Sequence, residues 1–454
     1  MMRDSARRIL IFPVRMLWKI FSRTLSIVLL PVSALSWILR LAPWFSRIAD
    51  ADVVVLMTAP TGFGHSLIGP DLMRRLYPGQ RCLFFIASWL YEHNHKVSLL
   101  WKDLDVVFIS RLITAIPYRH RVIAIPFLRW HDAMAIWLTR KIVTLVSGGR
   151  ARFQTVNEMY HDALALKNAW PPAMGTGDDK KKGADGVKLM AQLQLLQMRK
   201  PESPVRLPEE IRNDITPRLE RLWREAGHEG AVKLCCLYLR YEKRESYTTR
   251  LRNSSSLEHH LPAVRLLGEA GYQVLLTGDF EIDDATRKDF RGTLVDDSDL
   301  DIDRDIYQLF AGLEADIFIG NHGGGDLPAV VNEIPSLYLD WFPYSHGRKN
   351  AWVYFKAARD HEGHFLPGRR LITDFVYDAA ASFGTLINNT QEEITDAVAC
   401  FIEDVKSMDM PDPHANVAAL IPEDTQFHIT GARLSPAWVR RNILSDNETE
   451  SATA

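Results

Sequence analysis

The chain has 454 residues, of which 47% are hydrophobic and 24% charged, and its formal net charge is −2. This balance excludes a disordered chain, and the near-neutral charge gives no sign of a nucleic-acid-binding protein. Two domains are the simplest expectation for this length. The four cysteines, Cys82, Cys235, Cys236 and Cys400, have neither metal-binding spacing nor the pattern of a disulfide framework. We therefore expect a reducing, cytoplasmic compartment.

Residues 1–48 form an apolar, basic segment. Residues 1–50 hold seven Arg and one Lys against two Asp. Cationic side chains attract anionic headgroups while apolar side chains enter the acyl boundary. The uncharged stretch between Arg23 and Arg40 has 16 residues, fewer than the about 20 that a spanning helix needs. We predict a membrane-associating segment over 1–48, peripheral or monotopic at the cytoplasmic face of the inner membrane. A single span, or a helix pair packed on the protein itself, are the alternatives.

Residues 49–205 predict a first Rossmann-like domain, because apolar runs alternate with helical stretches as in a parallel sheet. The expected strands are 51–57, 81–88, 105–110 and 121–127, and the expected helices are 66–78 and 131–146. Residues 170–205 combine glycines, prolines and a DDKKK charge run, with helical spacing only near 187–198. We expect a loop or linker there.

A second Rossmann-like domain is predicted over 206–405. Its expected strands are 231–240, 272–279, 293–297, 316–321 and 335–340, and its expected helices are 256–271, 301–315 and 324–334. Cys235 and Cys236 lie inside one of these apolar runs and should be buried. Residues 406–454 form a C-terminal extension that ends in a frayed tail, and its earlier part is open to packing back on the first domain.

The loop after the expected strand 316–321 is the most informative stretch. It holds Asn321, His322, Gly323, Gly324, Gly325 and Asp326. In open α/β sheets ligands bind beyond the carboxyl ends of the strands. Glycine lets the backbone approach a ligand, and a following helix offers free N–H groups to an anion. With Asp326 as candidate N-cap, this pattern favours a phosphate or diphosphate, and a tight turn without a ligand is the alternative.

Two arginines are candidate partners of that anion. Arg240 ends the strand 231–240, and Arg252 precedes Asn253 just before a helix. A guanidinium makes bidentate, permanently charged contacts to a diphosphate leaving group, and it could take the place of a metal ion. Gly278 and Asp279 follow the next strand and suit a ribose, base or sugar. Ordinary surface arginines and a simple β-turn are the alternatives.

The first domain has a matching loop, TGFGH. The loop holds Thr61, Gly62 and Gly64 but lacks the third glycine of a dinucleotide fingerprint. It therefore suits an acceptor or the reacting sugar instead. His65 could act as a general base, since the ordinary pKa of histidine lies near working pH. A lone histidine is more often structural.

The sequence predicts no metal site. Asp299, Asp301 and Asp303 copy the start of a calcium loop, but Arg304 stands where the turn glycine belongs and Phe310 where the closing Glu should be. We interpret this stretch as a solvated loop.

The order of these motifs resembles a family of bacterial glycosyltransferases associated with surface polysaccharides. It is more remotely similar to fucosyltransferase-like enzymes of the GT-B type. The matching pairs, within residues 230–340, are Arg252–Asn253, Gly271–Tyr272, Gly278–Asp279 and the loop Gly320–Gly325. The resemblance implies two Rossmann-like domains that face a cleft, with Arg240 or Arg252 holding the donor diphosphate without a metal. The family often has His where Tyr238 stands.

The predicted function is therefore glycosyl transfer from a nucleotide-sugar to a glycan or lipid-linked acceptor in bacterial surface polysaccharide biosynthesis. By the remote analogy the reaction is inverting, and it needs no cofactor beyond the donor. A GT-B-shaped nucleotide-sugar epimerase or hydrolase, and a non-catalytic membrane-bound scaffold of the same fold, are the alternatives.

Overall fold

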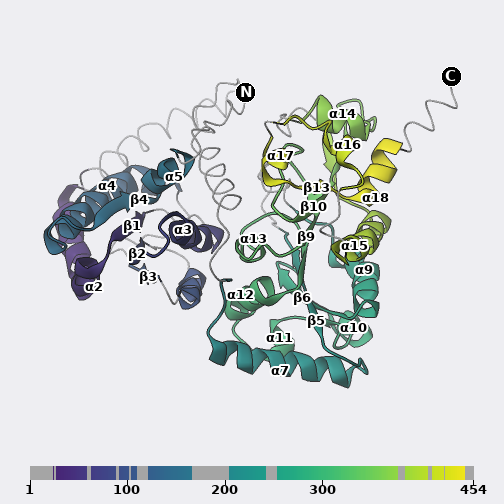
Figure 1. Ribbon diagram of the computed structural model, residues 1–454, viewed down its shortest axis with the longest axis horizontal. Coiled ribbons are helices and arrows are strands. Elements are labelled where there is room, and N and C mark those ends of the chain that lie inside the picture. The colour runs from purple at the N-terminus through teal and green to yellow at the C-terminus, as the bar shows by residue number, and fades with distance from the viewer. Residues whose placement is uncertain are drawn as a thin grey trace, which may run out of the picture. The chain divides into compact units, whose positions relative to one another are not determined.

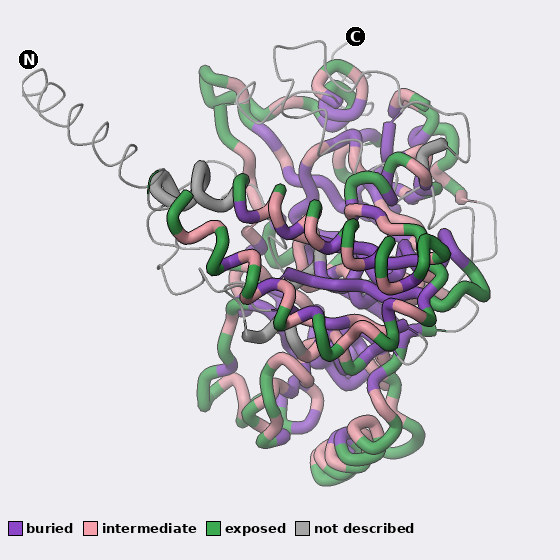
Figure 2. The backbone as a smooth tube through the Cα atoms, turned by 90° about the vertical axis from the view of Figure 1, so that its left-hand side faces the viewer, coloured by how far each residue is buried: buried purple, intermediate pink, exposed green. Residues whose placement is uncertain are grey.

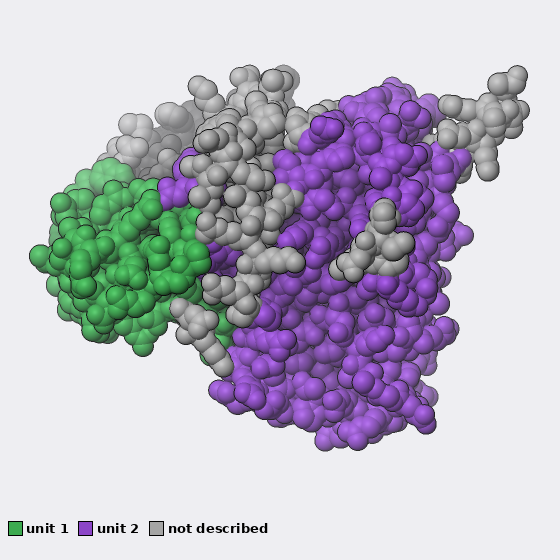
Figure 3. Space-filling view, in the orientation of Figure 1, with its two compact units in different colours: residues 1–62, 76–159 green, residues 63–75, 160–454 purple. Residues whose placement is uncertain are grey.

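The computed structural model divides into two compact units (Figures 1 and 3). The first unit is Met1–Gly62 with Leu76–Met159, and the second is Phe63–Arg75 with Tyr160–Ala454. The structure describes residues 24, 27–58, 63–87, 92–101, 104–109, 121–165, 204–241, 253–376, 384–406, 412–423 and 425–444. For 63–65, 92–95, 121–129 and 164–165 it describes the backbone only.

A four-stranded parallel sheet is the centre of the first unit, in the order β3-β2-β1-β4. Its strands are β1 (Val53–Met57), β2 (Cys82–Ile86), β3 (Asp105–Phe108) and β4 (Arg152–Thr155). Every residue of β1 and β2 is buried, which is typical of central parallel strands (Figure 2). Three predicted strands are confirmed, whereas β4 was missed because its sequence, RFQT, is short and largely polar.

The helices before, between and after these strands are η1 (Ala42–Trp44), α2 (Phe45–Asp50), α3 (Phe63–Leu76), η2 (Glu92–Leu100), α4 (Arg121–Val146) and α5 (Val156–Ala165). The expected strand at 121–127 is wrong, because these residues are the first turns of the 26-residue helix α4. A short apolar run has no period that separates a strand from a buried helix turn.

The N-terminal helix Ile27–Asp50, which ends in η1 and α2, has a mean hydropathy of 1.6 over its most apolar window. By length and composition alone it is long enough to cross a membrane, because it continues through Arg40 and Arg47 beyond the uncharged stretch. One side of it nevertheless packs on the first unit, where Trp37, Leu41 and Ile48 join the core.

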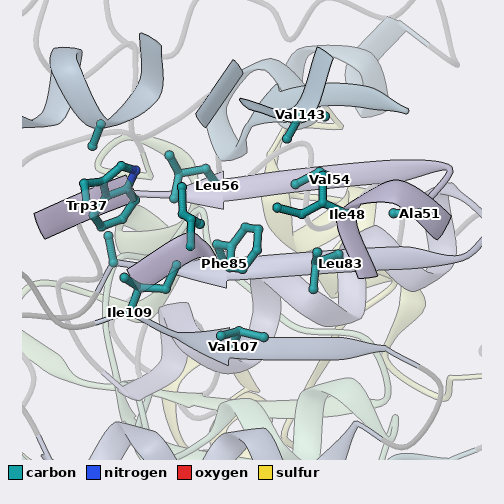
Figure 4. Close-up of a cluster of buried hydrophobic side chains, with 13 residues drawn as sticks. Trp37, Ile48, Ala51, Val54, Leu56, Leu83, Phe85, Val107, Ile109 and Val143 are labelled. Carbon is teal, nitrogen blue, oxygen red and sulfur yellow. The ribbon is translucent and has the colours of Figure 1, made fainter. Parts of the chain in front are cut away.

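That core covers one face of the sheet (Figure 4). Trp37, Leu41 and Ile48 meet Ala135 and Val143 of α4 over the same sheet face. The strand residues beneath them are Val54, Leu56, Leu83, Phe85, Val107 and Ile109, which alternate along their strands as residues on one face must. The first unit thus begins before residue 49, and the predicted domain bounds also differ in that 63–75 falls with the second unit.

A seven-stranded parallel sheet is the centre of the second unit, in the order β13-β10-β9-β8-β5-β6-β7. Its strands are β5 (Lys233–Leu239), β6 (Tyr272–Gly278), β7 (Leu294–Val295), β8 (Ile317–Gly320), β9 (Ser336–Trp341), β10 (Ala351–Phe355) and β13 (Arg433–Leu434). A separate antiparallel pair consists of β11 (Ala357–Arg359) and β12 (Thr385–Ile387). All five strands predicted for this half are confirmed, and Cys235 and Cys236 are buried as expected.

Helices cover both faces of this sheet, with α9 and α15 on one side and α12 and α13 on the other (Figure 1). The helices are α7 (Glu209–Glu225), α9 (Leu257–Glu269), α10 (Asp284–Asp289), α11 (Asp297–Leu300), α12 (Arg304–Glu314), α13 (Leu327–Val331), α14 (Gly368–Thr373), α15 (Gln391–Lys406), α16 (Ala415–Ala418), α17 (Gln426–Thr430), α18 (Pro436–Val439) and η5 (Arg440–Leu444). The fold is therefore mixed α/β with two parallel sheets.

The C-terminal extension belongs to the second unit. Strand β13 pairs in parallel with β10, through Trp352 opposite Arg433 and Val353 opposite Leu434. The described part of 412–444 thus includes the strand that completes one edge of the second sheet. The predicted linker at 170–205 lies largely outside the described residues, and so does the frayed tail.

Candidate functional site

The predicted donor-site residues lie at one edge of the second sheet. Strands β8, β5 and β6 are neighbours and run parallel. Their carboxyl ends therefore share an edge, and each end carries one predicted element. Arg240 follows β5, Gly278 ends β6 and Asp279 follows it, and the glycine loop, residues 320–326, begins at the last residue of β8.

Tyr238 explains why the glycine loop needs glycines. An ideal Cβ on Gly320 would lie 2.3 Å from the carbonyl oxygen of Tyr238, and one on Gly325 would lie 2.3 Å from its ring carbon Cε2. No side chain fits at those distances, so the loop rests directly on the Tyr238 ring. Burial raises the pKa of Tyr238 to about 12 against the opposing charge of Arg240, and the phenol stays neutral at working pH.

The guanidinium of Arg240 lies beside the glycine loop. An ideal Cβ on Gly323 would be 3.4 Å from Arg240 Nη1. The backbone of Arg240 is fixed on both sides by Ser254, whose Oγ accepts from the Arg240 N–H at 3.1 Å and whose N–H donates to the Arg240 carbonyl at 2.8 Å. Arg240 is half-buried, so its permanent charge stands next to a partly exposed stretch of bare backbone.

Asp326 supports the loop from inside and is not a helix cap. It is fully buried, and its side chain makes no capping hydrogen bond to α13, a helix of only five residues. Instead the carboxylate accepts from the Gly323 N–H at 3.2 Å, from Tyr338 Oη at 3.3 Å and from Arg348 Nε at 3.3 Å. Burial raises the pKa of Asp326, and the charge of Arg348 opposes that rise. Asp326 thus occupies the predicted N-cap position of α13, but its side chain does not cap the helix, because the carboxylate turns inward to a buried cation.

The two polar residues at the start of the loop have different surroundings. Asn321 is buried, and its Oδ1 accepts from the His322 N–H at 2.6 Å, so it braces the loop. His322 is half-exposed and its ring lies 4.8 Å from the Trp341 ring, centroid to centroid. Trp341 in turn contacts the Tyr338 ring at 4.5 Å and lies under Arg348.

Gly278 and Asp279 join the ends of β5 and β6. Gly278 has φ +101°, and an ideal Cβ there would lie 2.1 Å from the Leu239 carbonyl oxygen, so only glycine fits. The Asp279 N–H donates to that same carbonyl at 2.9 Å. The exposed Asp279 carboxylate accepts from the Tyr241 N–H at 3.0 Å, which holds the chain as it leaves Arg240.

The structure reveals a buried polar network that the sequence reasoning missed. Lys356, which follows β10, is only 1% exposed and donates to the Asn253 carbonyl at 2.9 Å and to Asn388 Oδ1 at 2.5 Å. Asp340, in β9, accepts from the Ser255 N–H at 2.7 Å. Burial lowers the pKa of Lys356, and Asp340 opposes that change. The sequence did carry a signal for this network, because Asp340 lies near the end of the apolar strand β9 and Lys356 directly follows the apolar strand β10.

Other predicted residues are placed only in part. Arg252, Thr61 and Gly62 lie outside the described residues. Gly64 and His65 belong to the first turn of α3, where only the backbone is described. Their roles, like those of Asn253 and Gly324, stay predictions.

Acidic side chains in the stretch after β7 cap the two helices that follow. Asp303 accepts from the N–H groups of Asp305 and Ile306 at the start of α12, and Asp296 caps α11 in a reciprocal pair with Asp299. Within the described part of the chain, no group of three or more His, Cys, Asp or Glu side chains is arranged to hold a metal ion.

No protein-family model matches the chain, and no curated protein matches it. Among solved structures, the chain is similar to a glycosyl transferase family 9 protein from Veillonella parvula, at 12% identity and a TM-score of 0.40, covering 78% of this chain and 98% of that one. It is also similar to the E. coli ADP-heptose LPS heptosyltransferase II, at 12% identity and 0.39, covering 78% and 99%. A third similarity, at 12% identity and 0.39 and covering 88% and 99%, is to Phytolacca americana UGT2 complexed with UDP-2-fluoro-glucose and pterostilbene. These are distant similarities.

The site itself combines the guanidinium of Arg240 with the glycine backbone of residues 323–325. Such a surface suits an anion with several oxygens, because the guanidinium donates in a fork and the glycines let the anion come close to the backbone. Asp279 adds an exposed acceptor on the neighbouring strand, as a hydroxylated group beside the anion would need.

Proposed function

We propose that the protein is a glycosyltransferase whose second unit binds a nucleotide-sugar. The observation that carries this proposal is the placement of Arg240 beside the glycine loop at the carboxyl edge of a parallel sheet. The diphosphate lies against Gly323–Gly325 and is paired with Arg240, while Asp279 contacts a ribose or sugar hydroxyl. Asp326 and Tyr238 hold the loop without touching the ligand.

The proposed reaction is a single inverting displacement. An acceptor hydroxyl attacks the anomeric carbon as the bond from that carbon to the diphosphate oxygen breaks, and the nucleoside diphosphate leaves with the electron pair. Arg240, together with Arg252, stabilises the charge on the leaving group without a metal ion. His65 takes the proton of the acceptor hydroxyl. The carboxyl edge of the first sheet holds the acceptor.

The proposed acceptor is a growing glycan or a lipid-linked sugar of bacterial surface polysaccharide biosynthesis. The apolar helix Ile27–Asp50 supports this choice, since it would hold the enzyme at the cytoplasmic face of the inner membrane, beside such an acceptor. The basic residues of 1–23, including Arg7, Arg8 and Arg15, would add attraction to anionic lipid.

A thermal-shift screen tests the donor site. Nucleoside diphosphates and nucleotide-sugars are added to the wild type, to Arg240→Ala and to Arg369→Ala, a control at an exposed arginine of α14. A ligand at about 100 times its Kd stabilises a protein by about 2.7 kcal/mol. We expect a stabilising compound in the wild type and in the control, and a much smaller shift in Arg240→Ala.

Two results would count against the proposal. One is a folded wild type that responds to no compound, and the other is an Arg240→Ala variant that responds as strongly as the control. Product analysis with donor alone and then with acceptor separates transfer from an epimerase or hydrolase, because only a transferase needs the acceptor for turnover.

A further inference from the structure

Exposed apolar side chains are concentrated on two helices of the first unit. Eight of the twelve large hydrophobic side chains that are exposed among the described residues lie there. They are Ile27, Val28, Val32, Leu35 and Leu39 of the N-terminal helix and Trp130, Trp137 and Leu145 of α4, with exposed fractions from 48% to 81%. We call these eight residues the apolar helix face.

Apart from Ile27, the residues of each helix share one side. At about 100° per residue, Val28, Val32, Leu35 and Leu39 fall within a stripe about 60° wide, and Trp130 and Trp137 differ by about 20°. An ordinary surface helix has its polar side toward water. Here the side of the N-terminal helix that faces water is apolar, and on α4 the exposed side carries two tryptophans and Leu145 beside Lys141 and Thr144.

The two helices are held next to each other over one face of the sheet. Trp37 Nε1 donates to Thr139 Oγ1 at 3.0 Å in a buried bond, and both helices contribute to the core of Figure 4. Because both undersides are fixed to the same sheet face, the exposed stripes belong to one outer layer. A rigid apolar layer of this kind fits a flat partner.

Charge and residue type indicate which flat partner. Residues 27–49 contain no acidic residue, and 121–146 hold one, Asp132, against four Arg and Lys. Lys141 is exposed and lies about 20° from Trp130 around the helix. Tryptophan rings favour the headgroup level of a bilayer, and cationic side chains favour anionic lipid. The sequence of residues 1–23, which precede the N-terminal helix, is apolar and basic.

We propose that the apolar helix face lies in the plane of an anionic lipid bilayer, with α4 as a second membrane contact beside the N-terminal helix. Trp130, Trp137 and Leu145 enter the boundary between headgroups and acyl chains, and Lys141 pairs with lipid phosphate. This binding is independent of the sugar-transfer proposal, because it needs no residue of the donor site.

Co-sedimentation of the full chain with vesicles tests the proposal. The vesicles are pure phosphatidylcholine, or about three parts phosphatidylcholine to one part phosphatidylglycerol. The variant Trp130→Ser/Trp137→Ser removes two interfacial rings, and Phe365→Ser is the matched control, since Phe365 is 60% exposed in the second unit. We expect the double variant to bind the anionic vesicles at least about tenfold more weakly, and the control to bind as the wild type does.

A second variant, Lys141→Glu, tests the charge. It should weaken binding to the anionic vesicles while leaving the weaker binding to neutral vesicles unchanged. Circular dichroism and the thermal midpoint establish that each variant is folded, and the nucleotide thermal shift reports on the donor site separately. Wild-type binding in both the double variant and Lys141→Glu would overturn the proposal. So would a double variant that keeps vesicle binding but loses self-association in sedimentation velocity, because the face would then join two copies of the chain.

Discussion

The contact between the glycine loop and Tyr238 makes a sharp prediction about Gly325→Ala. The added methyl group would lie 2.3 Å from Cε2, 2.7 Å from Cδ2 and 2.8 Å from Cζ of Tyr238. All three atoms belong to one rigid ring, which is held from below by Phe318 at 6.4 Å between centroids. Because the ring is rigid, it cannot yield to the methyl group as the end of a flexible side chain would. The loop or β5 must therefore shift.

Overpacking of this kind costs about 1–3 kcal/mol of unfolding free energy. Tyr238→Val ends the side chain at Cγ and removes the three atoms nearest to the added methyl group of Gly325→Ala, at its own cost of about 2–4 kcal/mol. In that background the methyl group no longer clashes with the ring. The cost of Gly325→Ala should then fall to about zero, so the two variants together cost less than their sum.

Gly320→Ala is the matched control. Its methyl group would lie 2.3 Å from the carbonyl oxygen of Tyr238, which every side chain at position 238 retains. Tyr238→Val should therefore leave the cost of Gly320→Ala nearly unchanged. Urea unfolding of the wild type, the three single variants and the two double variants gives the midpoints, with the slope monitored for constancy.

The reasoning would be refuted by an equal cost of Gly325→Ala in both backgrounds, since the clash with the ring would then not exist. Rescue of Gly320→Ala by Tyr238→Val would refute it as well, because it would mean that the strand backbone moves freely. If the prediction holds, Gly325→Ala should also weaken the nucleotide thermal shift, as the displaced loop no longer matches the ligand.

Two further predictions concern buried polar groups. Lys356→Met removes the buried hydrogen bonds to the Asn253 carbonyl and to Asn388 Oδ1 and should cost about 1–3 kcal/mol at pH 7. Burial lowers the pKa of Lys356 below its usual 10.5, so the unfolded chain binds more protons, and wild-type stability should gain a contribution as pH rises toward 10.5 that Lys356→Met lacks. Thermal midpoints of both proteins from pH 7 to about pH 10 test this, and identical pH slopes would contradict it. Thr139→Val leaves the Trp37 indole N–H unpaired at the contact between α4 and the N-terminal helix and should cost about 1–3 kcal/mol. Urea midpoints in the Trp37→Phe background should show a smaller cost, and an undiminished cost would mean that the hydrogen bond does not matter.

The positions of most strands followed from the sequence. Apolar runs such as 51–57 and 272–279 are too continuous for a half-exposed element, and they became the fully buried strands β1 and β6. The approach of Arg240 to the glycine loop could also be anticipated, because parallel strands bring the loops at their carboxyl ends to one edge. These inferences need only local pattern and a general rule of topology.

Helix α4 and Asp326 show where that reasoning ends. The apolar run 121–127 has no period that separates strand from helix, and the 26-residue helix was decided by its packing on the first sheet. Asp326 stands where an N-cap is expected, yet its carboxylate pairs with Arg348, 22 residues later in the chain. Which partner wins depends on distances that only the folded backbone sets.

The sequence by itself therefore determined the α/β class, the buried strands and the loops in which polar residues gather. Only the tertiary structure decided that Tyr238 fills the space under the glycines, and that Lys356 and Asp340 brace the chain after Arg252. It alone also showed that an apolar helix near the N-terminus is docked on one side and exposed on the other. The physical reason is that the period of apolar residues depends only on neighbours in the sequence, whereas a contact between residues far apart in the sequence depends on how closely two elements pack.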